Sequence, residues 1–527
     1  MSTQSEKSSI DNRLTRQTSS VRLSKAGDDT QVRVQTLSGS SIDDEAELAR
    51  LGYKSEFARE FKSLSGTLMC FCLGTAIAGI MADNVTETAE IVSAYPTNGG
   101  LYSASAYLVP RAYRPIVGWT VGWLNLLGQA AGVASTEYGL AQMILSAASL
   151  STNGEYVATA AQTYGLFAGL LCVHGLLNSL ATKWLAKITQ SFVFINLGTL
   201  IAIVIALLIK TENKHSASYV FTHTINGSGW NSQGLVFLLG LLSVQWTMTD
   251  YDATAHISEE VQRASYAAPV AIFIAVLGTG IFGWIYNIVY MICSGDIADY
   301  DGSIYAPAQI IYTNVGPKGF YVLWTGVCLT AFLVVQTALQ ANARTFFAFS
   351  RDQGLPDRGL FAKLAPNRIP VWSVWLVVFI SLLMGLLAFA SYTAVAAIFA
   401  LCAMALDTSY IIPIACKLIF RDHPEVQYKP GPFDLGRGFL GWAIPLIAIF
   451  WTSFVVIILA LPTVIPVTKD NMNYASVVTG GVMILSLAWY YAGGRRHYKG
   501  PRNVIAEEND ALAAATGAEF EGGKPVH

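Results

Sequence analysis

Charged residues are scarce in this chain. Asp, Glu, Lys and Arg make up 13% of its 527 residues, and hydrophobic residues make up 53%, whereas a soluble protein averages about 25% charged residues. The net charge of −2 gives no electrostatic basis for a nucleic acid partner. The composition therefore argues against a soluble globular domain and predicts a polytopic protein in a lipid bilayer.

Signatures of catalysis are also missing. The sequence holds no phosphate-binding glycine loop, no Ser/His/Asp pattern in soluble loops and no soluble segment long enough for a catalytic domain. Its seven cysteines lie in or at the ends of apolar runs without metal-ligand spacing, so we interpret them as small buried apolar side chains. We expect neither an enzyme nor a cofactor or metal site.

Long apolar runs dominate the rest of the chain. A spanning helix needs about 20 mostly apolar residues, and the candidate runs number eleven: 64–82, 116–149, 165–184, 192–209, 233–249, 268–293, 320–349, 371–389, 393–419, 440–461 and 475–491. The residues before the first run are polar and lack apolar periodicity, which is typical of disorder. We therefore predict a disordered N-terminal tail (1–63), a membrane domain (64–492) and a C-terminal tail (493–527).

Basic residues mark alternate connections between these runs. Lys and Arg favour cytoplasmic loops, and here they cluster in the following places: before 116, near 183–187, at 263, along 344–368, along 417–437 and after 491. Both tails are thus predicted to be cytoplasmic. At the N-terminal end the rule conflicts with itself, because the single run 64–82 would join two cytoplasmic segments. Either this run does not cross the bilayer or one helix is missing.

The stretch 233–262 interrupts an apolar helix with polar residues. The interruption contains Thr247, Thr249, Asp250, Tyr251 and Asp252. In lipid each carboxylate would cost roughly 2.5–3.5 kcal/mol, so such residues normally face a bundle interior or a watery cavity. We predict a broken helix whose polar residues bind the substrate, as in carriers that hold substrate near the bilayer midplane. The alternative is that Asp252 is a plain helix N-cap.

Two more carboxylates lie inside long apolar runs. Glu137 in GVASTEYGLA and Asp407 in ALCAMALDTSY are candidates for proton coupling, and a structural hydrogen bond to a neighbouring helix is the alternative for each. His174, alone in its apolar run, is interpreted as structural rather than as a proton relay. Past the break, three polar residues either gate the cytoplasmic mouth or form a solvated helix end: His256, Glu259 and Glu260.

Longer motifs resemble one family. The segments are AEIVSAYPTNGGLYSASAYLVPRAY (89–113), WTMTDYDATAHISEEV (246–261), ANARTFFAFSRDQGLP (341–356) and YKPGPFDLGR (428–437). They are similar to segments of the fungal amino-acid, GABA and choline permease group of the amino acid-polyamine-organocation (APC) superfamily. The resemblance implies an all-α polytopic membrane protein of twelve helices, ten of them in two LeuT-like inverted five-helix repeats. It also implies that the broken sixth helix lines the substrate site.

The resemblance implies a function as well. Relatives are commonly proton-coupled uptake systems, so we expect a secondary transporter for an amino acid or GABA, with H+ as coupling ion, in a fungal plasma membrane or, alternatively, a vacuolar membrane. The chain departs from the pattern between Phe61 and Ala89, where relatives have two full helices and it has room for about one. Two further readings stay open: a carrier of choline, a polyamine or a vitamin precursor, and a non-transporting product of a truncated gene model.

Overall fold

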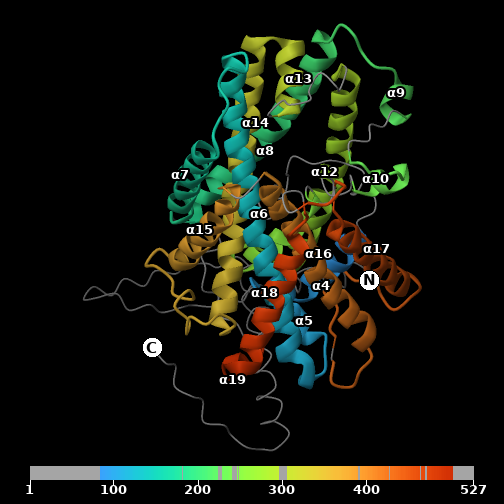
Figure 1. Cartoon of the computed structure of the whole chain (residues 1–527). Helices are drawn as coiled ribbons and strands as arrows, with labels where there is room; N and C mark the ends of the chain where they lie inside the picture. Colours follow the sequence, from blue (N-terminus) through green and yellow to red (C-terminus); the bar gives the residue numbers. More distant parts are fainter. Residues whose placement is uncertain are drawn as a thin grey trace, which may run out of the picture.

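The computed structural model describes residues 83–501 apart from 181, 223–227, 240–245, 247, 296–304, 390–391, 427, 463 and 469–471. The secondary-structure elements of this part of the chain are helices (Figure 1). In chain order they are α4 (Asp83–Ala94), α5 (Gly100–Tyr107), η3 (Arg111–Tyr113), α6 (Arg114–Ser151), α7 (Ala160–Asn178), α8 (Thr182–Lys210), α9 (Ala217–Thr222), α10 (Gln233–Leu239), η4 (Tyr251–Glu260), α12 (Ala264–Cys293), α13 (Ala306–Val315), α14 (Pro317–Arg351), α15 (Val371–Gly385), η6 (Leu386–Phe389), α16 (Tyr392–Phe420), α17 (Leu440–Ala460), α18 (Ala475–Trp489), η7 (Tyr490–Gly494) and α19 (Arg495–His497).

Within the described ranges, eight helical segments are long and apolar enough to cross a bilayer. They cover Ala160–Asn178, Thr189–Lys210, Ala264–Cys293, Pro317–Arg351, Val371–Phe389, Ala397–Phe420, Leu440–Ala460 and Ala475–His497. Each coincides with a run predicted from the sequence. The all-α polytopic class is thereby confirmed.

The other three of the eleven predicted runs have different outcomes. The run 116–149 forms α6, a helix of 38 residues that buries Asn125, Gln129 and Glu137; with these polar residues it is not among the eight apolar spans. The run 233–249 contains α10, which ends at Leu239. The run 64–82 and the tail 1–63 lie outside the described residues, so they stay predictions.

The cysteines are less uniform than the sequence suggested. Cys293, Cys402 and Cys416 are buried, as expected of small apolar side chains, but Cys172 is exposed on α7. The expectation of burial was wrong at Cys172, because α7 turns that face away from its neighbouring helices. Cys328 is half-buried, and Cys70 and Cys72 lie outside the described residues.

Helix α6 lies at the centre of the bundle, between α14 and α16. Small residues bring α6 and α16 close together: a Cβ on Gly128 would lie 2.6 Å from Leu406 Cγ, and one on Gly132 would lie 3.2 Å from Cys402 Sγ. Such small-residue contacts let helix backbones approach each other in membranes. The buried polar residues of both helices therefore lie inside the protein and away from lipid.

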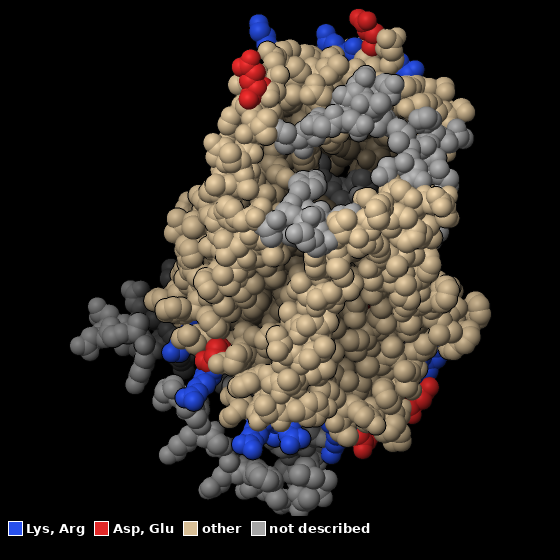
Figure 2. Space-filling view, viewed as in Figure 1, with Lys and Arg blue, Asp and Glu red and all other residues tan. Residues whose placement is uncertain are grey.

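Charges gather at the two ends of the molecule. On the face drawn in Figure 2, the coloured Lys, Arg, Asp and Glu atoms lie towards the top and bottom, with an uncharged band between them. Hydrogen bonds join connections that the charge rule assigns to the same side: Arg111 N to Glu425 Oε2 at 3.0 Å and Asn367 Nδ2 to the Ser179 carbonyl at 3.1 Å on the basic side, and Ile465 N to the Ser228 carbonyl at 2.9 Å on the other. This pairing of connections agrees with the topology predicted from residue 116 onward.

Candidate functional site

The predicted break in the central helix lies at Asp250. This residue has φ 61° and ψ 22°, in the left-handed region, which is unusual for a residue other than glycine but is tolerated by aspartate. It precedes the 3-10 helix η4, whose N-cap it is, without a capping hydrogen bond from its side chain. The N-cap alternative for Asp252 was therefore wrong, because Asp252 lies within η4.

Side chains at the break have open hydrogen-bonding capacity. Thr249 Oγ1 and Asp250 Oδ1 are buried and have no hydrogen-bond partner within the described part of the chain. A buried polar atom without a partner costs about 1–3 kcal/mol, so such a pair is typical of a place where a ligand or water binds. Tyr251 packs its ring against Tyr410, 4.9 Å away. Thr247 lies outside the described residues.

Asp252 is satisfied by neighbouring side chains. Its Oδ1 accepts a 2.7 Å hydrogen bond from the Tyr410 hydroxyl of α16, and its Oδ2 lies 3.2 Å from His256 Nε2. His256 Nδ1 in turn lies 3.3 Å from the Asn98 carbonyl. The four residues join η4 to α16 and to the turn before α5, so Asp252 holds the broken helix in place.

The turn that leads into α5 needs glycine at Gly100, the first residue of that helix. Its φ is +52°, and a Cβ there would lie 2.6 Å from His256 Cε1. Because L residues other than glycine are strained at this φ and the imidazole fills the space, the turn can approach η4 only with glycine. The contact of this turn with the broken helix was not predicted from the sequence.

Past the break, buried ion pairs tie η4 to α14. Glu259 lies 3.3 Å from Arg351 Nη2 and Glu260 lies 2.7 Å from Arg344 Nε. Asn98 donates its N–H to Glu259 Oε1 at 3.1 Å and accepts the Glu259 N–H on its Oδ1 at 3.0 Å. His256, Glu259 and Glu260 are fully buried, so the solvated-end alternative was wrong.

The contact residues Asn98, Arg344, Arg351 and Tyr410 were not identified as site residues from the sequence. Both arginines were counted as orientation charges, and Arg344 was weighed against Asp407 without a pairing being predicted. A signal was available for Arg344, which interrupts an apolar run much as Glu137 does, and an arginine in such a place normally needs a buried partner.

The two predicted proton-coupling residues lie on different helices, and Asp407 is one turn before Tyr410, which contacts the break. Both Glu137 on α6 and Asp407 on α16 are fully buried, as predicted. Glu137 Oε2 lies 2.7 Å from Nδ1 of His174 on α7. His174 therefore has a charged partner that the sequence did not reveal, because the two residues are 37 positions apart.

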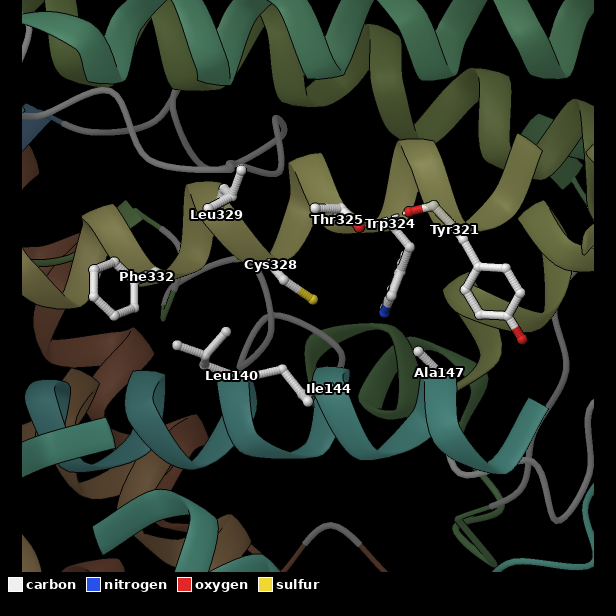
Figure 3. A pocket seen from close by; sticks show the side chains of 9 residues that line it. All are labelled: Leu140, Ile144, Ala147, Tyr321, Trp324, Thr325, Cys328, Leu329 and Phe332. Carbon is white, nitrogen blue, oxygen red and sulfur yellow. Dashed lines mark hydrogen bonds between the residues drawn. The ribbon is translucent and has the colours of Figure 1, made fainter. Parts of the chain in front are cut away.

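A cavity of about 300 Å³ opens between α6 and α14. Figure 3 shows Leu140 and Ile144 of α6 facing Cys328 and Phe332 of α14 across it. Its lining is almost entirely apolar, and none of the predicted site residues contributes to it. An apolar space of this kind cannot satisfy the charged groups of a zwitterion, so the substrate site is better sought at the break.

Known proteins are similar along most of the chain. An uncharacterized amino-acid permease of Schizosaccharomyces pombe is 42% identical, with 89% of this chain and 92% of the relative covered. Amino-acid permease 2 of Neurospora crassa is 34% identical, over 86% and 88%. A GABA-specific permease of Saccharomyces cerevisiae is 30% identical, over 91% and 89%.

The first of these alignments is longer than the part of this chain that it covers. It runs over 514 positions, yet it takes in 89% of 527 residues. The relative therefore has residues without counterparts here, and they outnumber the roughly 20 that one membrane span requires.

The protein-family model described as amino acid permease matches residues 54–484 of this chain. This range includes the predicted break, the buried acids and all eight apolar spans except the end of the last one. Together with the relatives, the match shows that the chain belongs to the amino acid permease family and is an integral membrane transporter.

Proposed function

We propose that this protein takes up an amino acid or GABA across the plasma membrane, driven by proton entry. Relatives named as amino-acid and GABA-specific permeases support the substrate class. The observation that carries the proposal is the left-handed break at Asp250, with two buried, unpartnered oxygens beside it. We propose no cofactor and no enzymatic step.

Substrate recognition is assigned to both sides of the break. Asp250 Oδ1 and Thr249 Oγ1 accept hydrogen bonds from the substrate's ammonium group. The N–H groups that begin η4 point towards the break, where a helix start favours a substrate carboxylate. Thr247 and Tyr251 complete the site, and Asp252 is a positioning residue because Tyr410 and His256 already bind both of its oxygens.

Transport requires the inner end to open. In the present conformation the ion pairs of Glu259 with Arg351 and of Glu260 with Arg344 join η4 to α14. Substrate bound at the break reaches the cytoplasm only after these contacts separate. Glu137 and Asp407 are the candidate proton carriers.

The test is uptake of radiolabelled compounds by cells that lack their own permeases. GABA, a neutral amino acid and choline are offered separately at acidic and neutral external pH, and a fluorescent fusion reports which membrane contains the protein. We expect uptake of GABA or the amino acid that increases at acidic pH, with fluorescence at the cell surface. Uptake of choline alone would instead establish an organic-cation carrier.

The length of the alignment with the Schizosaccharomyces pombe permease favours a second candidate: a non-transporting product of a truncated gene model. One relative has more residues without counterparts here than one membrane span requires, and the charge pattern places the conflict before residue 116. A version with a relative's additional segment inserted between Phe61 and Ala89 is therefore assayed beside the chain as written. Uptake by the extended version alone would favour this second candidate.

A further inference from the structure

The contacts of Glu137 and His174 determine how many protons the two side chains hold together. His174 Nδ1 lies 2.7 Å from Glu137 Oε2, and His174 Nε2 lies 3.0 Å from the carbonyl oxygen of Phe332 on α14. A carbonyl only accepts hydrogen bonds, so Nε2 must carry a hydrogen. The tautomer of a neutral His174 is thereby fixed by the backbone of α14.

Two protonation states satisfy both contacts. In one, the imidazolium donates from Nδ1 to the Glu137 carboxylate. In the other, a neutral imidazole accepts at Nδ1 from a protonated Glu137 carboxyl. Both states hold one proton between Nδ1 and Oε2, and without it two lone pairs would face each other across 2.7 Å.

Electrostatics also favours the proton. With it the pair is neutral overall, whereas without it the pair would carry one negative charge, although both side chains are fully buried. An isolated buried charge is strongly unfavourable. This arrangement of α6, α7 and α14 therefore favours the protonated pair over the deprotonated one.

On the described parts of α14, α15 and α16, other charged groups are too distant to replace the proton. The nearest charged residue to Phe332 on α14 is Arg344, about 18 Å further along the helix at 1.5 Å per residue. On α16 the contact of Gly128 with Leu406 sets Asp407 about 15 Å from Glu137 along α6. Helix α15, which also packs on α6 and α7, contains no ionisable residue.

A second acid–histidine pair, Asp252 with His256, is less suited to this task. Its contacts are longer, at 3.2 and 3.3 Å, and the Tyr410 hydroxyl donates to the same carboxylate at 2.7 Å. Both oxygens of the Asp252 carboxylate thus have a neighbouring polar group. By contrast, the second oxygen of Glu137, Oε1, is buried without a hydrogen-bond partner among the described residues.

We propose that Glu137 and His174 form the proton-binding site of this transporter, which rests on the proposed proton-driven uptake. The proton enters from water on the outer side, occupies the gap between Oε2 and Nδ1, and leaves to water on the inner side. Only the bonds that this proton makes to Glu137, His174 and water form and break. Glu137 and His174 thus neutralise each other only in the loaded state.

The same helix connects this pair to the substrate site. Ser135, two residues before Glu137, accepts a 3.2 Å hydrogen bond from Trp246 Nε1, just ahead of the break. At 3.6 residues per turn the two residues point to nearly opposite sides of α6. On the other side, Asn178 Nδ2 donates to the Gln336 carbonyl at 3.2 Å, one turn from the His174 contact. Loss of the proton would loosen α7 from α6 and so disturb the packing behind Trp246.

The first experiment uses proteoliposomes with the membrane potential clamped to zero and radiolabelled GABA as the probe. One proton per substrate across a one-unit pH difference supports about tenfold accumulation. We expect wild-type protein to approach this value and Glu137→Gln to reach none, while Glu137→Gln still exchanges labelled for unlabelled GABA. The glutamine amide can donate to Nδ1, so the variant mimics the loaded pair and is expected to fold. Glu155→Gln, on an exposed loop, is the matched control.

The second experiment requires no substrate. A pH-indicator dye measures proton uptake by the purified protein after an acid step. We expect wild-type protein and Glu155→Gln to bind about one proton more per molecule than Glu137→Gln, as one acid is removed. Equal uptake by Glu137→Gln and wild type, or a loss seen only in Asp252→Asn, would overturn the assignment. If GABA does not move at all, the uptake proposal fails, and this measurement still decides the proton site.

Discussion

Neighbouring carboxylates at the helix break differ in their partners. Asp252 is bound by a tyrosine and a histidine, whereas Asp250 has a left-handed backbone and a buried oxygen without a described partner. Strained backbone and unpaired polar atoms gather at functional sites. At the scale of single residues, Asp250 is therefore the better candidate for direct contact with substrate.

Replacing Asp250 by asparagine tests this difference. A hydrogen bond to a charged group contributes about 1.5–3 kcal/mol, so Asp250→Asn is expected to lower the uptake rate at low substrate concentration by about tenfold or more. The measurement is radiolabelled uptake normalised to the amount of protein at the cell surface. Asp422→Asn, at an exposed position, is the control, and unchanged uptake by Asp250→Asn would remove Asp250 from the site.

The buried pair of Arg344 and Glu260 gives a second prediction at this scale. Removing one partner of a buried ion pair costs about 3–5 kcal/mol, because the other charge stays unpaired. Arg344→Gln is expected to lower the thermal unfolding temperature of the purified protein clearly. Arg437→Gln, whose pair with Asp422 is largely exposed, should leave it unchanged. Equal unfolding temperatures for both variants would contradict a stabilising role for the buried pair.

At the scale of helices, α6 connects most of the features discussed. It contacts α16 through Gly128, α7 through Glu137 and the helix before the break through Ser135. Close packing transmits small displacements, because interiors are nearly as dense as organic crystals. A shift of α6 would thus be felt at both the proton pair and the break.

Alanine substitutions in α6 test the importance of its close contact with α16. A Cβ on Gly128 would lie 2.6 Å from Leu406 Cγ and 2.9 Å from the Leu406 backbone nitrogen, which cannot move cheaply, while a Cβ on Gly139 would meet no atom within 4 Å. Overpacking costs about 1–3 kcal/mol, so Gly128→Ala should unfold at lower denaturant concentration than wild type. Gly139→Ala should be neutral or stabilising by about 0.5–1 kcal/mol. If the two variants unfold together, the helices do not approach as closely as described.

At the scale of the whole molecule, orientation follows from charge. Arg495, Arg496 and Lys499 lie at the end where α18 finishes, and basic loops favour the cytoplasm. An epitope after His527 should be labelled by antibody only in permeabilised cells, whereas one inserted after Thr211, between α8 and α9, should be labelled in intact cells. Surface labelling of the C-terminal epitope would reverse the assigned orientation.

The sequence by itself determined the class of protein, the eight apolar spans and the position of the break. These features depend on stretches of neighbouring residues, because the cost of placing a segment in lipid is roughly a sum over that segment. The alternation of basic connections has the same local origin. The resemblance added the family, which the comparisons confirmed.

Only the tertiary structure decided which polar groups meet. Asp252 and Tyr410 are 158 positions apart, and Glu259 and Arg351 are 92 apart, so no local pattern relates them. His174 looked like an isolated structural histidine until the packing of α6, α7 and α14 gave it a carboxyl on one side and a carbonyl on the other. Spacing along a helix predicts which face a residue lies on, but the partner on that face depends on how the helices pack.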